Sequence, residues 1–311
     1  MNSRSEDGRS HPDAGFGAIM SERPRLINVA YRLLGSLSDA EDVVQETYAR
    51  WYALSRLQQE ALESPGAWLT TVATRICLDL LGSARVRRER YVGEWIPEPL
   101  PDPTEWITGR SGATTDPAEH VTLDESVSMA FLVVLDSMTP AERVSFILHD
   151  VFRYPFAQVA EIVGRTPAAC RQLASSGRRR LDEAQATPAS TAQQAEVVRH
   201  FKEAWGSKDI GALISLLDPD ATATADGGGR AVAAPAPIEG AEEIAHHYIT
   251  LATLAPADVT LEECLVNGCP GLAMQHNGVT ATVFAFDLAG DRIKRIWAVR
   301  NPDKLRAWRK G

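Results

Sequence analysis

The stretch FAQVAEIVGRTPAACRQLASSGRRRL, residues 156–181, decides how the middle of this chain folds. Apolar residues between Phe156 and Ile162 recur at the three- and four-residue spacing of one helical face. Gly164 ends this helix, and Thr166 with Pro167 supplies the N-cap and first position of a second one. Two helices joined by such a turn form a helix-turn-helix, whose second helix lies in the DNA major groove. The stretch therefore predicts a DNA-binding motif.

The second helix of this motif is strongly basic, with five arginines and no acidic residue between Arg165 and Arg180. Polar side chains near the start of such a helix read base edges, whereas later arginines suit phosphates. The expected DNA contacts are Arg165, Ala168, Arg171, Gln172, Ser175, Arg178, Arg179 and Arg180. An ordinary helix pair with a solvated basic face is an alternative that these residues alone leave open.

Upstream, the segment SDAEDVVQET, residues 38–47, predicts an amphipathic helix with an acidic surface. Ser38 and Glu41 have the spacing of a capping box, and Val43, Thr47 and Trp51 supply a buried stripe. The opposite face carries acidic and amide side chains: Asp39, Asp42, Gln45 and Glu46. Such a face repels DNA, and from chemistry alone a simple solvated surface is the favoured interpretation.

A third helix begins at Ser64 and Pro65 and runs toward Gly82, followed by a cluster of arginines. Aromatic rings and arginines can hold unstacked bases, with stacking contributing about 1–3 kcal/mol per base. The candidate contacts to opened DNA are Trp68, Thr71, Arg75, Asp79, Arg85, Arg87 and Arg88. Trp68 is equally well explained as a core residue, because tryptophan at helical spacing is usually buried.

Composition limits the classes of protein to consider. The 311 residues carry a net charge of -9, which argues against coating nucleic acid by bulk charge alone. No apolar run approaches the roughly 20 residues of a membrane span, and the four cysteines contain no C-x-x-C pair. We expect a cytoplasmic protein with reduced thiols, without membrane association, metal or cofactor.

The chain divides into six segments by composition and periodicity. We expect a disordered arm at 1–22, a helical domain at 23–91, a proline-rich linker at 92–118, a second helical domain at 119–185, a short linker at 186–193 and a last domain at 194–311. In the last domain, helices precede alternating runs separated by turn dipeptides such as Asn267-Gly268 and Asn277-Gly278. This order predicts an α+β domain with an antiparallel sheet.

Three motifs in this order resemble those of extracytoplasmic-function (ECF) sigma factors. Residues 39–47 are similar to the helix that binds the clamp of bacterial RNA polymerase. The helix around Trp68 and the arginines that follow are similar to the promoter-melting, minus-ten reader, and the helix-turn-helix to the minus-thirty-five reader. The resemblance covers residues 23–185 and makes 23–91 sigma region 2 and 119–185 sigma region 4.

The family resemblance implies that this protein binds core RNA polymerase at its clamp and flap and directs promoter-specific transcription initiation. Two positions depart from the family pattern: Gly82 stands where many members have Arg, and Arg75 where Asn is common. The preferred minus-ten sequence is therefore left open.

The linker sequence YVGEWIPEPL, residues 91–100, resembles the signature of an ECF group that carries a SnoaL-like C-terminal extension. Residues 194–311 resemble that fold, a cone of helices against a curved sheet. Two further motifs match the group: Asp226, Gly227, Gly228, Gly229 and Arg230, and Asn301, Pro302, Asp303, Lys304 and Leu305. The resemblance implies that the first motif contacts the sigma part and the second exerts positive control, so that the extension regulates activity in cis. From the residues alone, the glycine run is better explained as a flexible hairpin loop.

Cones of this fold also host enzymes, and the cone leaves room for a small ligand. Its polar side chains include Asp218, Asp220, His246, His247, Tyr248 and His276, but no spacing fixes a catalytic pair. The adjacent His246 and His247 point about 100 degrees apart on a helix, so at most one of them faces a pocket. We expect no enzyme. The alternative is a small-molecule sensor or a cyclase- or isomerase-like domain fused to a DNA-binding module.

Overall fold

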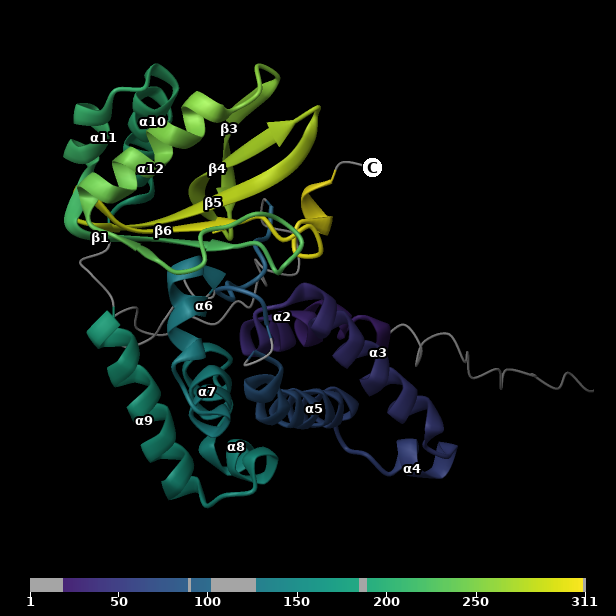
Figure 1. The fold of residues 1–311 in the computed structure, drawn as a ribbon. Helices are drawn as coiled ribbons and strands as arrows, with labels where there is room; N and C mark the ends of the chain where they lie inside the picture. Colours follow the sequence, from purple (N-terminus) through teal and green to yellow (C-terminus); the bar gives the residue numbers. More distant parts are fainter. Residues whose placement is uncertain (1–18, 89–90, 102–126, 185–188, 310–311) are drawn as a thin grey trace, which may run out of the picture.

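The computed structural model describes residues 19–88, 91–101, 127–184 and 189–309, with side chains omitted at 84–88. It consists of two helical parts followed by an α+β domain, as expected from the sequence (Figure 1). The helical parts contain α2 (Arg23–Leu34), α3 (Leu37–Ala53), α4 (Arg56–Glu60), α5 (Pro65–Arg88), α6 (Met129–Asp136), α7 (Pro140–Phe146), η2 (Ile147–Val151), α8 (Phe156–Val163) and α9 (Pro167–Ala184). The α+β domain contains α10 (Thr191–Ser207), α11 (Ile210–Leu216), β1 (Leu217–Asp226), β2 (Ile238–Glu239), α12 (Ala241–Leu254), β3 (Val259–Val266), β4 (Cys269–His276), β5 (Val279–Ala289), β6 (Arg292–Val299) and η3 (Arg306–Trp308).

The expected arm at residues 1–22 lies outside the described residues as far as position 18, but residues 19–22 are ordered. Ile19 is buried in the helical core, and its carbonyl accepts a hydrogen bond from the Tyr48 hydroxyl at 3.1 Å. Within the described residues, the folded part of the chain therefore begins at least four residues earlier than the sequence pattern indicated. The few apolar residues shortly before Pro24, such as Phe16, Ile19 and Met20, are too few to show a helical period from which this contact could have been predicted.

The two helical parts share one hydrophobic core. Leu26 and Val44 of the first part belong to the same buried cluster as Phe146 and Val159 of the second. Polar contacts join them as well, since the Arg143 guanidinium donates to the carbonyl of Leu33 at 2.9 Å. Regions 2 and 4 are therefore packed together in this structure.

The sheet is mixed, with strand order β2-β1-β6-β5-β4-β3. Strands β3 to β6 are antiparallel and turn at the two predicted Asn-Gly pairs and at Gly290-Asp291, but β1 runs parallel to β6. This corrects the expectation of a wholly antiparallel sheet. The sequence of β1, LDPDATATAD, is rich in alanine and aspartate, which are uncommon in strands, so this strand was not recognised.

Strands β5 and β6 are buried on both faces. Phe284 and Phe286 pack under helices α10 and α12, whereas Val283 and Ala285 pack against residues of the linker and α6. Figure 1 shows the cone helices on one side of the sheet and α6 with the helical parts on the other. Continuous apolar runs such as VFAF at 283–286 follow from this double burial.

Candidate functional site

The helix-turn-helix has the predicted geometry. Gly164 ends α8 with a left-handed φ of 69°, and the Thr166 hydroxyl caps α9 by accepting from the Ala169 amide at 3.2 Å. All eight predicted DNA contacts of this motif are exposed: Arg165, Ala168, Arg171, Gln172, Ser175, Arg178, Arg179 and Arg180. The Arg171 guanidinium lies over the Phe156 ring, 5.2 Å from its centroid. The structure thus leaves a basic surface on α9 open to a ligand.

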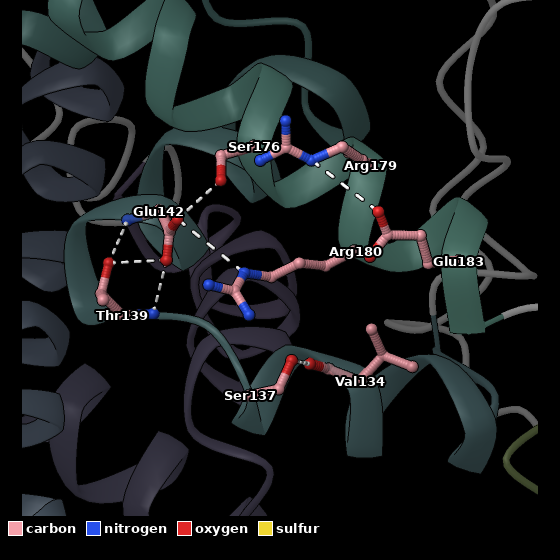
Figure 2. Close-up of polar contacts among 8 residues, drawn as sticks. All are labelled: Val134, Ser137, Thr139, Glu142, Ser176, Arg179, Arg180 and Glu183. Atoms are coloured by element: carbon pink, nitrogen blue, oxygen red, sulfur yellow. Dashed lines mark hydrogen bonds and ion pairs between the residues drawn. The ribbon is translucent and has the colours of Figure 1, made fainter.

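A network around Glu142 fixes α9 against α7 (Figure 2). The Glu142 carboxylate accepts hydrogen bonds from the Thr139 amide at 2.9 Å and the Ser176 hydroxyl at 2.8 Å, and it lies 3.9 Å from Arg180. Burial acts to raise the pKa of Glu142, but the hydrogen bonds from Thr139 and Ser176 and the charge of Arg180 hold it below its usual range. A charged Glu142 therefore orients the recognition helix.

Two further arginines of α9, Arg178 and Arg179, form ion pairs with acidic residues. Arg178 pairs with Asp150, whose side chain is only 2% exposed, and the Arg178 Nε donates to Asp150 Oδ1 at 3.0 Å. Arg179 lies 3.9 Å from Glu183 on the surface (Figure 2). Arg178 therefore has a structural function besides any contact with phosphate.

The predicted polymerase-binding residues lie on the outer side of α3. Asp42, Gln45 and Glu46 are exposed and Asp39 is half-buried, while the stripe of Val43, Thr47 and Trp51 is buried. The N-cap of this helix is Ser36, whose hydroxyl accepts from the Asp39 amide at 3.2 Å, so the predicted capping box at Ser38 was wrong. The N-cap therefore lies two residues before the predicted one, and the helix begins at Leu37.

The predicted minus-ten residues on α5 have mixed surroundings. Trp68 is half-buried, with its ring edge-on to Trp51 at 5.5 Å. The Thr71 hydroxyl bonds to the carbonyl of Ala67, and Asp79 is exposed. Arg75 donates to the carbonyl of Glu161 in α8 at 2.8 Å, so it joins region 2 to the helix-turn-helix. The side chains of Arg85, Arg87 and Arg88 lie outside the described residues.

The glycine-rich motif at residues 226–230 and the motif at residues 301–305 both contact the linker. The Asp226 carboxylate is fully buried and accepts from the Tyr91 hydroxyl at 2.6 Å, the Ile96 amide at 3.0 Å and the Lys304 ammonium at 2.7 Å. Asn301 donates to the same Tyr91 hydroxyl at 2.8 Å. We call this group of five residues the linker clamp.

The glycine run allows this close approach. Gly228 has a φ of 56°, and a Cβ there would lie 2.2 Å from the Asn301 side chain and 2.8 Å from the Tyr91 hydroxyl. Arg230 pairs with Asp303 at 3.1 Å on the exposed rim of the clamp. The glycine run is therefore a fixed contact surface and not a free hairpin loop.

The described part of the expected linker, residues 92–101, is largely buried. Ile96, Glu98 and Leu100 are less than 5% exposed. The Glu98 carboxylate accepts from the Leu37 amide at 2.8 Å, and burial raises the pKa of this carboxyl group even though backbone hydrogen bonds act to lower it. Residues 102–118 lie outside the described residues.

A second polar cluster joins the linker to region 2 and the C-terminal domain. The Tyr31 hydroxyl donates to the carbonyl of Glu98 at 2.7 Å and accepts from Asn267 at 2.6 Å, and Asn267 also pairs with the backbone of Leu100. Burial raises the pKa of Tyr31 above its usual range. Sequence reasoning treated Asn267 only as a turn residue. Its burial follows from the packing of three distant segments.

The C-terminal domain encloses a cavity of about 720 Å³ between its helices and the sheet. Its wall is mostly apolar, including Trp205, Leu251 and Phe284, with His247 and Arg300 at a polar part of the lining. His246 is exposed on the outer face of α12, so only one of the adjacent histidines faces the cavity. Burial and the charge of Arg300 lower the pKa of His247.

Comparison with known proteins identifies the chain. The family models for Sigma-70 region 2 and for Sigma-70, region 4 match residues 18–87 and 128–181. The ECF RNA polymerase sigma factor SigJ of Mycobacterium tuberculosis is 36% identical over 295 residues, covering 91% of this chain and 90% of that protein. This chain belongs to the ECF RNA polymerase sigma factors. The probable ECF sigma factor SigI of the same organism is 34% identical and covers 95% of this sigma factor and 96% of its own length.

The crystal structure of M. tuberculosis SigJ shares the whole architecture of this sigma factor. It has a TM-score of 0.71 at 31% identity and covers 95% of this chain and 98% of that one. As an ECF sigma factor, the protein binds core RNA polymerase and promoter DNA and directs promoter-specific transcription initiation. In the described part of the chain, no helix is long and apolar enough to span a membrane.

Proposed function

We propose that the C-terminal domain controls this sigma factor in cis by holding the linker between regions 2 and 4. The observation that carries the proposal is the buried Asp226 carboxylate, which binds the linker through Tyr91 and Ile96 and binds Lys304 of the C-terminal motif. Buried polar networks with every member paired favour one arrangement of the chain. The clamp therefore stabilises a closed form of the sigma factor.

The closed form does not match the spacing of promoter elements. At about 3.4 Å per base pair, minus-ten and minus-thirty-five elements about 25 base pairs apart are separated by roughly 85 Å along straight DNA. In the closed form, Arg75 of α5 instead touches Glu161 of α8, and both helices belong to one core. Promoter binding therefore requires the two regions to separate, and polymerase provides surfaces that hold them apart.

We further propose that Asp39, Asp42, Gln45 and Glu46 dock on the polymerase clamp while region 4 meets the flap. Exposure of the acidic face of α3 supports this assignment. On the DNA, Trp68, Thr71, Arg75, Asp79, Arg85, Arg87 and Arg88 would act at the minus-ten element, and the exposed residues of α9 at the minus-thirty-five element. Arg75 would be released from the carbonyl of Glu161 when regions 2 and 4 part.

Run-off transcription with core polymerase tests the control in cis. Asp226→Asn removes the charge opposite Lys304, so we expect more transcript at limiting polymerase, by several-fold, because the closed form is weakened. Asp220→Asn is the matched control, because Asp220 is exposed on the same strand. Unchanged transcription by Asp226→Asn, with loss of a crosslink between the linker and the C-terminal domain, would contradict the proposal.

The polymerase-binding face is tested separately by charge reversal. Asp42→Arg with Glu46→Arg should weaken binding to core polymerase at least tenfold and leave DNA binding equal or stronger, because positive charge attracts phosphate. Glu60→Arg with Glu63→Arg is the control, with the same change of charge on exposed residues outside α3. If both pairs behave alike, the effect is one of net charge and the docking assignment is wrong.

The cavity supports a sensing role for the C-terminal domain as a second candidate function. Among the described residues that line it, His247 is a titratable base and none is a carboxylate. A pairing of histidine with a carboxylate is therefore not present among these lining residues. The lining favours binding of a small ligand over catalysis.

A further inference from the structure

The cavity of the C-terminal domain has an apolar body and a polar end. Its volume of about 720 Å³ is in the range of roughly 300–1,000 Å³ that is typical of small-molecule sites. Trp205, Tyr248 and Phe284 form an aromatic wall, with ring centroids 4.9 to 6.2 Å apart. This part of the cavity suits a flat or branched hydrocarbon group.

Two unpaired donors mark the polar end. Arg300 is half-buried, and its Nε has no hydrogen-bond partner, while its Nη1 donates to the carbonyl of Val232. The hydroxyl of Thr282, a residue only 1% exposed, also lacks a partner. In the part of the chain that the structure describes, no carboxylate pairs with the Arg300 guanidinium. A half-buried cation without an acidic partner, beside a buried hydroxyl that also lacks one, favours a bound anion.

The charge of the polar end fits one negative charge. Two lysines also line the cavity, but Lys202 is paired with Glu263 at 2.9 Å and Lys208 is exposed to solvent. Arginine keeps its proton at neutral pH even when burial lowers its pKa, as it does for Arg300. The pKa of His247 is lowered by burial and by Arg300, so its imidazole is neutral and adds no second positive charge. A singly charged carboxylate or sulfonate matches this arrangement, whereas a dianion such as a phosphate monoester would leave one charge unpaired.

The polar end is continuous with the linker clamp. The backbone amides of Arg300 and Asn301 both donate to the carbonyl of Asp226, at 2.7 and 2.9 Å. The Arg300 side chain also holds Val232, which lies in the loop that follows the glycine run. The same guanidinium thus holds this loop and offers its free Nε to an anion, so an anion that reorients it also acts on the loop, one residue from the Asn301 contact to Tyr91.

We propose that the cavity binds an apolar monoanion, with Arg300 as its anchor and Thr282 as a second donor, and that binding loosens the linker clamp. The ligand class is a carboxylate or sulfonate on a hydrocarbon body. The effect on the clamp rests on the proposed control in cis, but the binding site does not. The two parts therefore have separate tests.

Binding is tested with two fluorescent probes of nearly equal shape. 8-Anilinonaphthalene-1-sulfonate carries one negative charge, and N-phenyl-1-naphthylamine lacks the sulfonate. With the full-length protein, we expect the sulfonate to bind at least tenfold more tightly than the neutral probe and to be displaced by decanoate more readily than by decan-1-ol. Equal affinities for the two probes would overturn the site, and this comparison needs no variant.

Variants then locate the anchor. Arg300→Met should reduce sulfonate affinity at least tenfold and leave the affinity for the neutral probe unchanged, and Thr282→Val should reduce sulfonate affinity severalfold. Arg292→Met is the matched control, because Arg292 is exposed at the other end of β6. Undiminished sulfonate binding by Arg300→Met would overturn the assignment of the anchor.

Run-off transcription tests the coupling. Decanoate should raise transcript from the wild-type protein at limiting polymerase and have no effect on Arg300→Met. Sulfonate binding without any effect of decanoate on transcription would overturn the coupling and leave the binding site standing. If Asp226→Asn itself leaves transcription unchanged, the proposed control in cis fails, whatever the probes show.

Discussion

The two faces of the C-terminal sheet are both covered, but they differ in how completely their polar groups are paired. On the linker side, the Asp226 carboxylate has three donors, and Asn267 binds both Tyr31 and the backbone of Leu100. On the cavity side, the Thr282 hydroxyl and the Arg300 Nε have no partner. The first face is an interface already filled by the protein's own chain, whereas the second still has room for a ligand.

The difference shows how one strand can serve two functions. Side chains alternate along a strand, so the cavity-facing Thr282 is followed by Val283 in the interdomain core. At the end of β6, Arg300 lines the cavity and the next residue, Asn301, contacts the linker. The two faces are therefore only one peptide unit apart at this point.

The largest expected effect comes from removing the buried ion pair between Asp226 and Lys304 on the linker side of the sheet. Asp226→Leu leaves the Lys304 ammonium, in a residue 9% exposed, without its carboxylate, and should cost about 3–5 kcal/mol of unfolding free energy. Asp303→Leu removes an exposed pair with Arg230 and should cost about 0–1 kcal/mol. Urea unfolding followed by tryptophan fluorescence measures both, and equal losses would show that the clamp is not a buried ion pair.

A smaller loss of unfolding free energy is expected when a side chain at position 228 displaces the linker from the end of the sheet. Gly228→Ala and Gly278→Ala both place a side chain at positive φ, which costs about 1–2 kcal/mol. Only Gly228 faces Asn301 and Tyr91, so its substitution should cost a further ~1–3 kcal/mol from overpacking. Limited proteolysis at residues 91–101 should be faster for Gly228→Ala alone. Identical behaviour of the two variants would contradict the close approach.

A pH dependence of opposite sign is expected for two glutamates. Burial raises the pKa of Glu98 above its ordinary value of 4.5, so its contribution to stability is greatest below that pH and is lost as pH rises through the raised pKa. Glu142 has a lowered pKa, so its contribution is present above the ordinary value and lost as pH falls through the lowered one. Stability profiles of Glu98→Gln and Glu142→Gln against wild type should therefore slope in opposite directions, and slopes of the same sign would contradict these environments.

The smallest effect is expected on the cavity side of the sheet, where the Thr282 hydroxyl has no partner. Thr282→Val removes a buried hydroxyl without a partner and should leave thermal stability unchanged or raise it by up to about 1 kcal/mol. Thr280→Val on the same strand removes a bond to the carbonyl of Trp308 and should lower stability by about 1 kcal/mol. A loss for Thr282→Val as large as for Thr280→Val would mean that its hydroxyl is already paired.

The sequence by itself determined the local elements and the family. Gly164, Thr166 and Pro167 define the helix-turn-helix because caps and left-handed glycines act within a few residues. The Asn-Gly turns defined the hairpins for the same reason. The acidic face of α3 was also readable, since helical periodicity alone separates it from the buried stripe.

Only the tertiary structure decided how these elements meet. The described part of the linker, whose prolines indicated a loose connection, is largely buried because Asp226, Asn267 and Lys304 bring polar partners to it from distant positions. Arg75 pairs with α8 because regions 2 and 4 share a core, and β1 joins the sheet in parallel because β6 offers it an edge. Such contacts depend on which surfaces are buried together, and burial is a property of the whole fold that no local pattern encodes.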